Sequence, residues 1–153
     1  MRYTKLMFLL LGFAATLCAA DSFVGTWKMN PAKTKYKAGK AAKEQTINIT
    51  ETGADMAVKV TGTAADGSKI SISYTLPSAG GTGKFIEAGP YDGVTSKRLG
   101  LNEREVTFMK GGKPVYTAHS KIAPDGKSLT VAGKGQSPAG QTVDGTAFYD
   151  KLQ

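Results

Sequence analysis

The sequence predicts an all-β fold, arranged as an antiparallel up-and-down β-barrel of roughly eight to ten strands. Apolar and polar residues alternate with a period of two through most of the chain, which is typical of half-buried strands. Glycine-containing turn signals separate these segments, and no segment shows sustained helical periodicity. Closure into a barrel removes the exposed sheet edges that invite aggregation, and a two-sheet sandwich is the competing arrangement.

The alternating segments define the strands in chain order. They comprise residues 47–49, 56–60, 70–74, 106–108, 115–122, 129–131 and 146–149. The connectors contain dipeptides that tolerate the positive φ of a tight hairpin, namely Thr52-Gly53, Asp66-Gly67, Asp92-Gly93, Gly111-Gly112 and Asp125-Gly126. Strands that are neighbours in sequence are therefore expected to pair. Two sets of residues are candidates for the inner face: Val58, Val60, Ile70, Ile72 and Tyr74, and Val106, Phe108, Ala147 and Tyr149.

The first 20 residues predict a secretory signal peptide. A basic start is followed by an apolar run over residues 6–15 and by small residues before Asp21, and the run is too short to span a bilayer. Cleavage after Ala20 leaves residues 21–153 as one domain without a thiol, since Cys18 is the only cysteine. Leu17 directly before Cys18 argues against a lipoprotein, so a periplasmic or secreted location is expected.

Basic residues are in excess and concentrate in one segment. The chain after Ala20 has 18 basic and 12 acidic residues, hence a formal charge of +6. Residues 30–45 lack strand alternation and predict a solvated loop or a one-turn helix over one end of the barrel. A sharper hypothesis is a basic lip that attracts an anionic group, aided by Tyr36, and its lysines are Lys33, Lys35, Lys37, Lys40 and Lys43. One basic loop with one tyrosine is weak evidence for nucleic-acid binding, which is not expected.

The stretch Phe23-Val24-Gly25-Thr26-Trp27-Lys28 contains a Gly-x-Trp motif directly after the predicted cleavage point. This stretch resembles the first strand of the calycin superfamily, the lipocalins and fatty-acid-binding proteins. The resemblance implies that Trp27 closes the floor of the barrel. Over nearly all of residues 22–151 the chain also resembles a family of small secreted bacterial proteins described as lipocalin-like, on residues 25–33, 96–98, 123–131 and 148–151. That family carries no agreed activity, so the resemblance implies a fold and a compartment.

Three departures from the better-known relatives limit what the resemblance implies. Fatty-acid-binding proteins hold a ligand carboxylate with an Arg-x-Tyr pair on the last strand, whereas this chain has Ala147 and Tyr149 at the corresponding positions. The 16 residues from 30 to 45 are too few for the helical pair of those proteins. Secreted lipocalins cover the Trp with an arginine, and neither Arg98 nor Arg104 lies on a predicted final strand.

No catalytic or metal-binding pattern stands out. His119 is the only histidine, and it shares strand parity with Val115 and Thr117, so it could face the interior. A local hydrogen bond is the simpler interpretation, because a catalytic zinc takes three protein ligands and a serine triad needs a nucleophile beside the imidazole. Glu103 and Glu105 would share one strand face as solvated charges. We therefore expect no enzyme activity, no cofactor and no metal.

The favoured functional hypothesis is a binding protein that holds a small apolar or amphipathic molecule inside the barrel. Candidate ligand contacts are Tyr74, Phe108, Tyr116, His119 and Tyr149. The alternative is a ligand-free module that binds anionic lipids or polymers of the cell envelope through its basic surface. The sequence leaves open the ligand, the oligomeric state, the choice between periplasm and cell exterior, and which strand face is interior.

Overall fold

The computed structural model describes residues 20–87 and 89–152, and these residues form twelve strands and no helix. The all-β barrel prediction is confirmed, but the strands number twelve where about eight to ten were expected. The strands are β1 (Gly25–Met29), β2 (Lys35–Ala38), β3 (Glu44–Thr52), β4 (Asp55–Thr63), β5 (Lys69–Pro77), β6 (Gly80–Thr82), β7 (Lys84–Phe85), β8 (Gly93–Gly100), β9 (Glu103–Lys110), β10 (Lys113–Ile122), β11 (Ser128–Gln136) and β12 (Thr142–Leu152). The predicted signal peptide, including Cys18, lies outside the described residues apart from Ala20.

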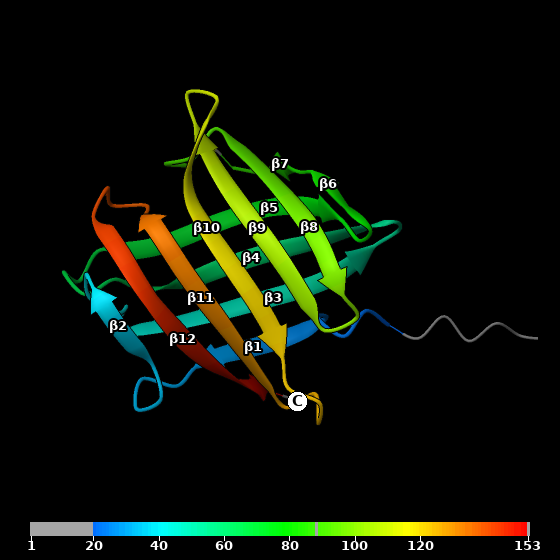
Figure 1. The fold of residues 1–153 in the computed structure, drawn as a ribbon, viewed down its shortest axis with the longest axis horizontal. Helices are drawn as coiled ribbons and strands as arrows, with labels where there is room; N and C mark the ends of the chain where they lie inside the picture. The colour runs from blue at the N-terminus through cyan, green and yellow to red at the C-terminus, as the bar shows by residue number, and fades with distance from the viewer. Residues whose placement is uncertain (1–19, 88, 153) are drawn as a thin grey trace, which may run out of the picture.

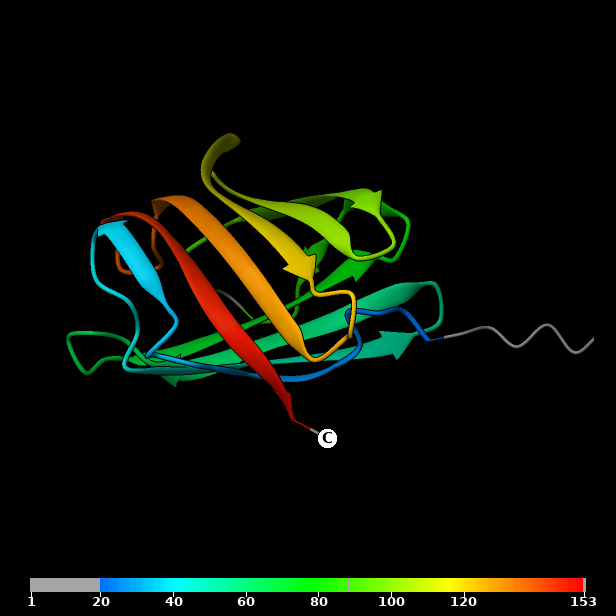
Figure 2. The same cartoon turned by 60° about the horizontal axis from the view of Figure 1, so that its bottom comes forward.

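All strands belong to one antiparallel sheet that is nearly closed. Its order is β6-β8-β9-β10-β11-β12-β1-β3-β4-β5-β7, and β2 pairs with β12. The strands β8 to β12 form one layer, which crosses the layer of β1, β3, β4 and β5 at a large angle (Figure 1). A second view shows the two layers joined where β12 meets β1 (Figure 2). Sequential hairpins account for most of the pairing, and four of the five predicted turn dipeptides lie in their turns. The prediction for Asp92-Gly93 is wrong, because Gly93 begins β8 and has no positive φ.

The remaining seam lies between β5 and β8. The short strands β6 and β7 bridge it, because β6 pairs with β8 and β7 pairs with β5. Two further backbone bonds support the bridge: the Gly83 nitrogen donates to the Val94 carbonyl at 2.8 Å, and the Ile86 nitrogen donates to the Ser73 carbonyl at 2.9 Å. Sequence reasoning missed β8 because its inward positions include the polar residue Ser96, which breaks the apolar alternation.

The segment after β1 differs from the predicted loop or helical turn, because residues 35–38 form the strand β2. Met29 pairs with Tyr149 and Lys35 pairs with Thr146, so β1 and β2 follow one another along β12 as a single interrupted strand. Two hydrogen bonds to the Phe148 backbone hold the bulge between them. The Asn30 nitrogen donates to the Phe148 carbonyl at 2.7 Å, and the Phe148 nitrogen donates to Thr34 Oγ1 at 3.1 Å. This arrangement places Tyr36 on the barrel wall.

One end of the barrel is closed by packed side chains around Trp27, which is fully buried. The Trp27 Nε1 donates to the Phe23 carbonyl at 2.9 Å. The Lys151 ammonium lies 5.0 Å from the centre of the Trp27 ring, so a lysine on the last strand covers the indole. The stem of Lys151 crosses Gly25, where a Cβ would lie 2.7 Å from the lysine Cε and where φ is +143°. The Gly-x-Trp spacing therefore leaves room for this cover.

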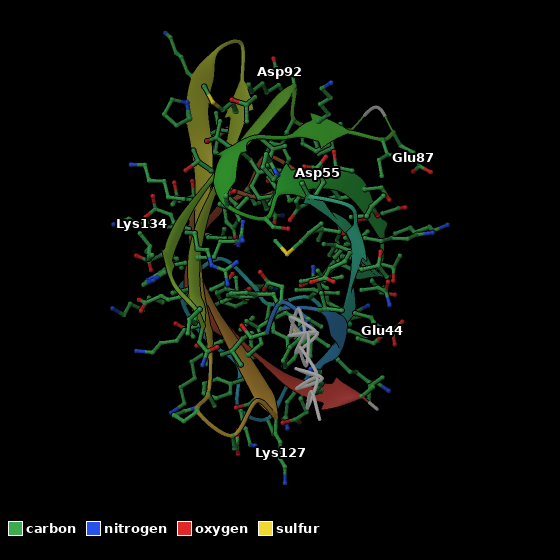
Figure 3. The ribbon with its side chains drawn as sticks, turned by 90° about the vertical axis from the view of Figure 1, so that its right-hand side faces the viewer. Glu44, Asp55, Glu87, Asp92, Lys127 and Lys134 are labelled. Carbon is green, nitrogen blue, oxygen red and sulfur yellow. The ribbon has the colours of Figure 1, made fainter. Side chains whose placement is uncertain are left out.

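Most charged side chains lie on the outside of the two layers, and Arg104 is a buried exception. Figure 3 shows Lys134 on the outer side of one layer and Glu44 and Glu87 on the opposite side of the molecule. Lys134 lies 3.9 Å from Asp144 across the β11–β12 pair, an exposed ion pair of small energetic weight. The inner faces are mainly apolar, which is what a barrel with an internal core or cavity requires.

Candidate functional site

The barrel encloses a cavity of about 470 Å³ above the packed end. Such a volume lies within the range of roughly 300 to 1,000 Å³ that small-molecule sites occupy. The mouth is formed by the connections around Lys40, Ala65, Tyr91 and Pro138, which lie between β2 and β3, β4 and β5, β7 and β8, and β11 and β12. The floor includes Phe23, which belongs to the packed end.

Both inner sets proposed from strand parity line this cavity. The first set comes from β4 and β5 and the second from β9 and β12, so the two layers each present one of them. The lining members are Val58, Val60, Ile70, Ile72, Tyr74, Val106, Phe108, Ala147 and Tyr149. The sequence left open which strand face is interior, and the structure shows that both candidate sets face a common space.

Aromatic rings form one part of the wall, centred on Phe108. The Tyr74 ring meets Phe108 edge-on with centroids 5.4 Å apart, and the Tyr91 ring lies at 4.9 Å on another side. Phe85 and Tyr116 complete the cluster at 6.3 and 6.0 Å. Aromatic pairs at these separations pack favourably, so this side of the cavity is a firm apolar surface.

Five tyrosines line the cavity, and two of them use their hydroxyls within the protein. Tyr149 donates a short hydrogen bond to Gln45 Oε1, and Tyr91 donates to the Gln136 carbonyl at 2.9 Å. Among the described residues, the hydroxyls of Tyr36, Tyr74 and Tyr116 make no hydrogen bond to another group. These three hydroxyls are the free polar groups on an otherwise apolar wall.

Burial keeps the cavity tyrosines protonated. Burial, together with the smaller influence of the neighbouring Tyr36 phenol, raises the pKa of Tyr116 to about 12. Burial also raises the pKa of Tyr74 and of Tyr149 well above the ordinary value. The free phenols therefore act as hydrogen-bond donors, and negative charge is disfavoured in their surroundings.

Arg104 is the one buried cation of the described interior, and sequence reasoning gave it no role. It lies at the floor and is 3% exposed. Its guanidinium donates to the carbonyls of Pro77 and Ser78 at 3.2 and 2.6 Å, and to Ser96 Oγ at 3.2 Å. It also lies 5.7 Å from the centre of the Phe23 ring. Burial lowers its pKa, and Asp21 opposes that shift. Its bonds fasten β9 to the end of β5, so we assign it a structural role.

His119 does not contact the cavity, which corrects the interpretation that it faces the interior. A register shift between Pro114 and Tyr116 changes the parity of β10, so that Tyr116, Ala118 and Ser120 line the cavity. The His119 side chain is 43% exposed, and its Nε2 lies 2.7 Å from Glu103 Oε1. The local surface interaction is thus the correct description, and His119 is removed from the ligand contacts.

The predicted basic lip is also only partly assembled. Lys40 lines the mouth of the cavity, together with Asp66 and Lys69. Lys43 lies beside Gly67 in the β4–β5 turn, near Asp66. Lys33 instead lies 3.7 Å from Asp150 beside the bulge that precedes β2. Lys35 and Lys37 are exposed on β2, on either side of the cavity-lining Tyr36. The five lysines therefore do not form one rim.

No group of three or more His, Cys, Asp and Glu side chains that could hold a metal ion occurs within residues 20–87 and 89–152. Over those residues, no helix has the length and apolar character needed to cross a bilayer.

Comparison with models of known families finds no match, and no curated protein matches the chain. The resemblance to lipocalin-like proteins therefore stays a prediction from the motif residues. The function of this chain is therefore inferred from the geometry of its cavity.

Proposed function

We propose that this protein binds a small apolar or amphipathic molecule inside its barrel, as an exported protein of the periplasm or the cell exterior. The observation that carries the proposal is the 470 Å³ cavity with a mainly apolar wall and three free phenol hydroxyls. A barrel of this size is filled by side chains unless it holds a ligand, and a cavity of this volume is uncommon in a purely structural interior.

The apolar wall would contribute most of the binding free energy, and the tyrosine hydroxyls would orient the ligand. Each Å² of apolar ligand surface removed from water contributes about 25 cal/mol, before the cost of immobilising the ligand. The apolar side chains of β3, β4 and β5, among them Ile47, Val58 and Ile72, provide that surface. A polar end of the ligand would be fixed by the hydroxyl of Tyr36, Tyr74 or Tyr116.

Native mass spectrometry of the protein purified from its own cell envelope tests the proposal directly. We expect a co-purifying molecule of discrete mass that is lost on denaturation. The same spectrum tests export, because cleavage after Ala20 gives a chain beginning at Asp21. A protein that carries no additional mass and also fails to take up an added apolar probe would contradict the binding proposal.

A cavity-filling variant provides the matched test. Ala118 lines the cavity, whereas the adjacent Thr117 does not, so Ala118→Leu fills the space and Thr117→Leu adds a similar side chain elsewhere on β10. We expect Ala118→Leu to weaken binding of naphthalene at least tenfold and Thr117→Leu to leave it unchanged, as measured by fluorescence titration. Equal binding by both variants would place the probe outside the barrel. Binding to anionic vesicles with steep salt dependence would then favour the envelope-interaction alternative.

A further inference from the structure

Two glycines form a flat platform on the inner wall of the barrel. Gly133 on β11 and Gly145 on β12 are direct cross-strand partners, and both are buried. Neither has a positive φ, so the backbone conformation does not demand glycine at these positions. The lack of space for a side chain demands it, because a Cβ at Gly133 would overlap the hydroxyl of Tyr116 and lie 2.8 Å from its Cζ. A Cβ at Gly145 would overlap the ring of Tyr36.

The two tyrosines reach this platform from opposite sides. Tyr36 lies on β2 and pairs with Gly145, whereas Tyr116 lies on β10 and pairs with Gly135, two residues from Gly133. The strand order is β10, β11, β12 and then β2, so the rings lie over adjacent glycines between their parent strands. Their phenols are close enough for Tyr36 to raise the pKa of Tyr116. The register of four strands thus places the two tyrosine rings over facing glycines.

We propose that Tyr36 and Tyr116 form a paired donor site for the acceptor oxygen of an uncharged carbonyl compound, such as a ketone or an ester. This inference rests on the proposed ligand-binding function and names the class of ligand. Both side chains line the cavity, and neither hydroxyl bonds to another described residue. Neither hydroxyl is among the fully buried polar atoms that lack a partner, so both are accessible from the cavity. A ligand oxygen that accepts from both phenols would replace contacts with water by two direct hydrogen bonds.

The charges around the cavity argue for an uncharged ligand. The charged residues that line it are Arg104 at the floor, bound to carbonyls and Ser96, and Lys40, Asp66 and Lys69 at the mouth. A ligand ammonium at the tyrosine pair would find no carboxylate partner among the lining residues of the middle of the cavity. A ligand carboxylate would lose hydration in surroundings that already disfavour ionised phenols. A carbonyl oxygen needs only the two donors.

Four probes with the same apolar body separate these possibilities: naphthalene, 2-acetylnaphthalene, 2-naphthoate and 2-naphthylmethylammonium. Their affinities for the protein are measured by fluorescence titration at pH 7. We expect the ketone to bind about tenfold more tightly than naphthalene, the gain of about one net hydrogen bond. The two ions are expected to bind more weakly than the ketone.

Variants then test whether the tyrosine pair causes the higher affinity of the ketone. Tyr36→Phe and Tyr116→Phe keep the rings and remove the donors, so each should reduce the advantage of the ketone over naphthalene by threefold or more. Gly133→Ala should reduce it as well, because the new methyl group displaces the Tyr116 hydroxyl. Tyr91→Phe is the matched control, since the Tyr91 hydroxyl is already bound to the Gln136 carbonyl, and it should keep the full advantage.

The outcomes separate this inference from the proposed function. If no probe binds, the cavity is not a binding site and both proposals are wrong. If naphthalene binds as tightly as the ketone, or 2-naphthoate binds most tightly, the cavity binds ligands but the carbonyl assignment is wrong. An advantage of the ketone that survives both Tyr→Phe variants would likewise overturn the assignment to this pair.

Discussion

The two halves of the barrel interior differ although the same strands build both. At the closed end, Trp27, Phe23 and Leu76 are at most 2% exposed and Arg104 fastens β9 to the end of β5. In the open half, the strands enclose the 470 Å³ cavity, and glycine occupies two neighbouring inward positions, 133 and 145. Alternation alone does not distinguish the halves, because every second residue points inward in both.

The difference shows that side-chain size, rather than strand geometry, decides where a barrel is solid. Large side chains meet across the closed end and exclude solvent. In the open half, the small side chains of Ala118 and Ala147 leave space at the wall, and the phenols of Tyr36 and Tyr116 lie flat over Gly145 and Gly133. We therefore expect the closed end to contribute most of the stability and the open half to contain the binding site.

The largest effect is expected at the closed end. Trp27→Ala should lower the free energy of unfolding by about 3 to 5 kcal/mol, because it empties a fully buried site and leaves the Phe23 carbonyl without its donor. Urea denaturation followed by circular dichroism measures the loss. Trp27→Phe serves as the control and should cost less, since it retains most of the ring. A loss below about 1 kcal/mol for Trp27→Ala would show that the closed end is not the stabilising half.

An intermediate effect is expected in the open half at high pH. Above about pH 10 the tyrosines of the unfolded chain ionise, whereas the folded protein holds the Tyr116 proton until its pKa of about 12. The folded state then binds more protons, so stability is complete below pH 10 and falls as pH rises through this window. A single such group contributes a slope of about 1.4 kcal/mol per pH unit.

Tyr116→Phe should make that slope shallower by up to the same amount. Urea midpoints measured between pH 9 and 12 determine the slope, and Thr117→Ala on the same strand is the control that removes no titrating group. An unchanged slope in Tyr116→Phe would mean that the Tyr116 phenol is hydrated in the folded protein and that the open half is wetter than its lining residues indicate.

The smallest effect concerns the outer cover of the closed end. Lys151→Met removes the ammonium from the Trp27 ring but keeps an apolar stem over Gly25, so we expect a loss of about 0.5 to 1 kcal/mol. Lys127→Met is the control, because Lys127 is an exposed lysine that contacts the same strand through its backbone carbonyl. Equal stability of the two variants would show that Lys151 does not stabilise the indole.

Sequence reasoning succeeded where a local pattern, such as period-two alternation, corresponds to a single type of secondary structure. Each predicted strand lies within an observed strand, for example residues 56–60 within β4 and residues 129–131 within β11. It failed at β2 and β8, whose residues lack clear apolar alternation, and at His119, because the register shift after Pro114 reversed the parity of β10. Four of the five predicted ligand contacts, Tyr74, Phe108, Tyr116 and Tyr149, line the cavity, and their role in binding stays a prediction.

The amino-acid sequence by itself determined the all-β class and most of the hairpin order, because period-two alternation and glycine turns act over a few residues. Only the tertiary structure decided that Lys151 covers Trp27, that Arg104 lies at the floor, and that the rings of Tyr36 and Tyr116 lie over a pair of facing glycines. Those contacts depend on the register between strands far apart in the chain. The sequence carries the residues for such contacts, but their distances are set only when the sheet closes.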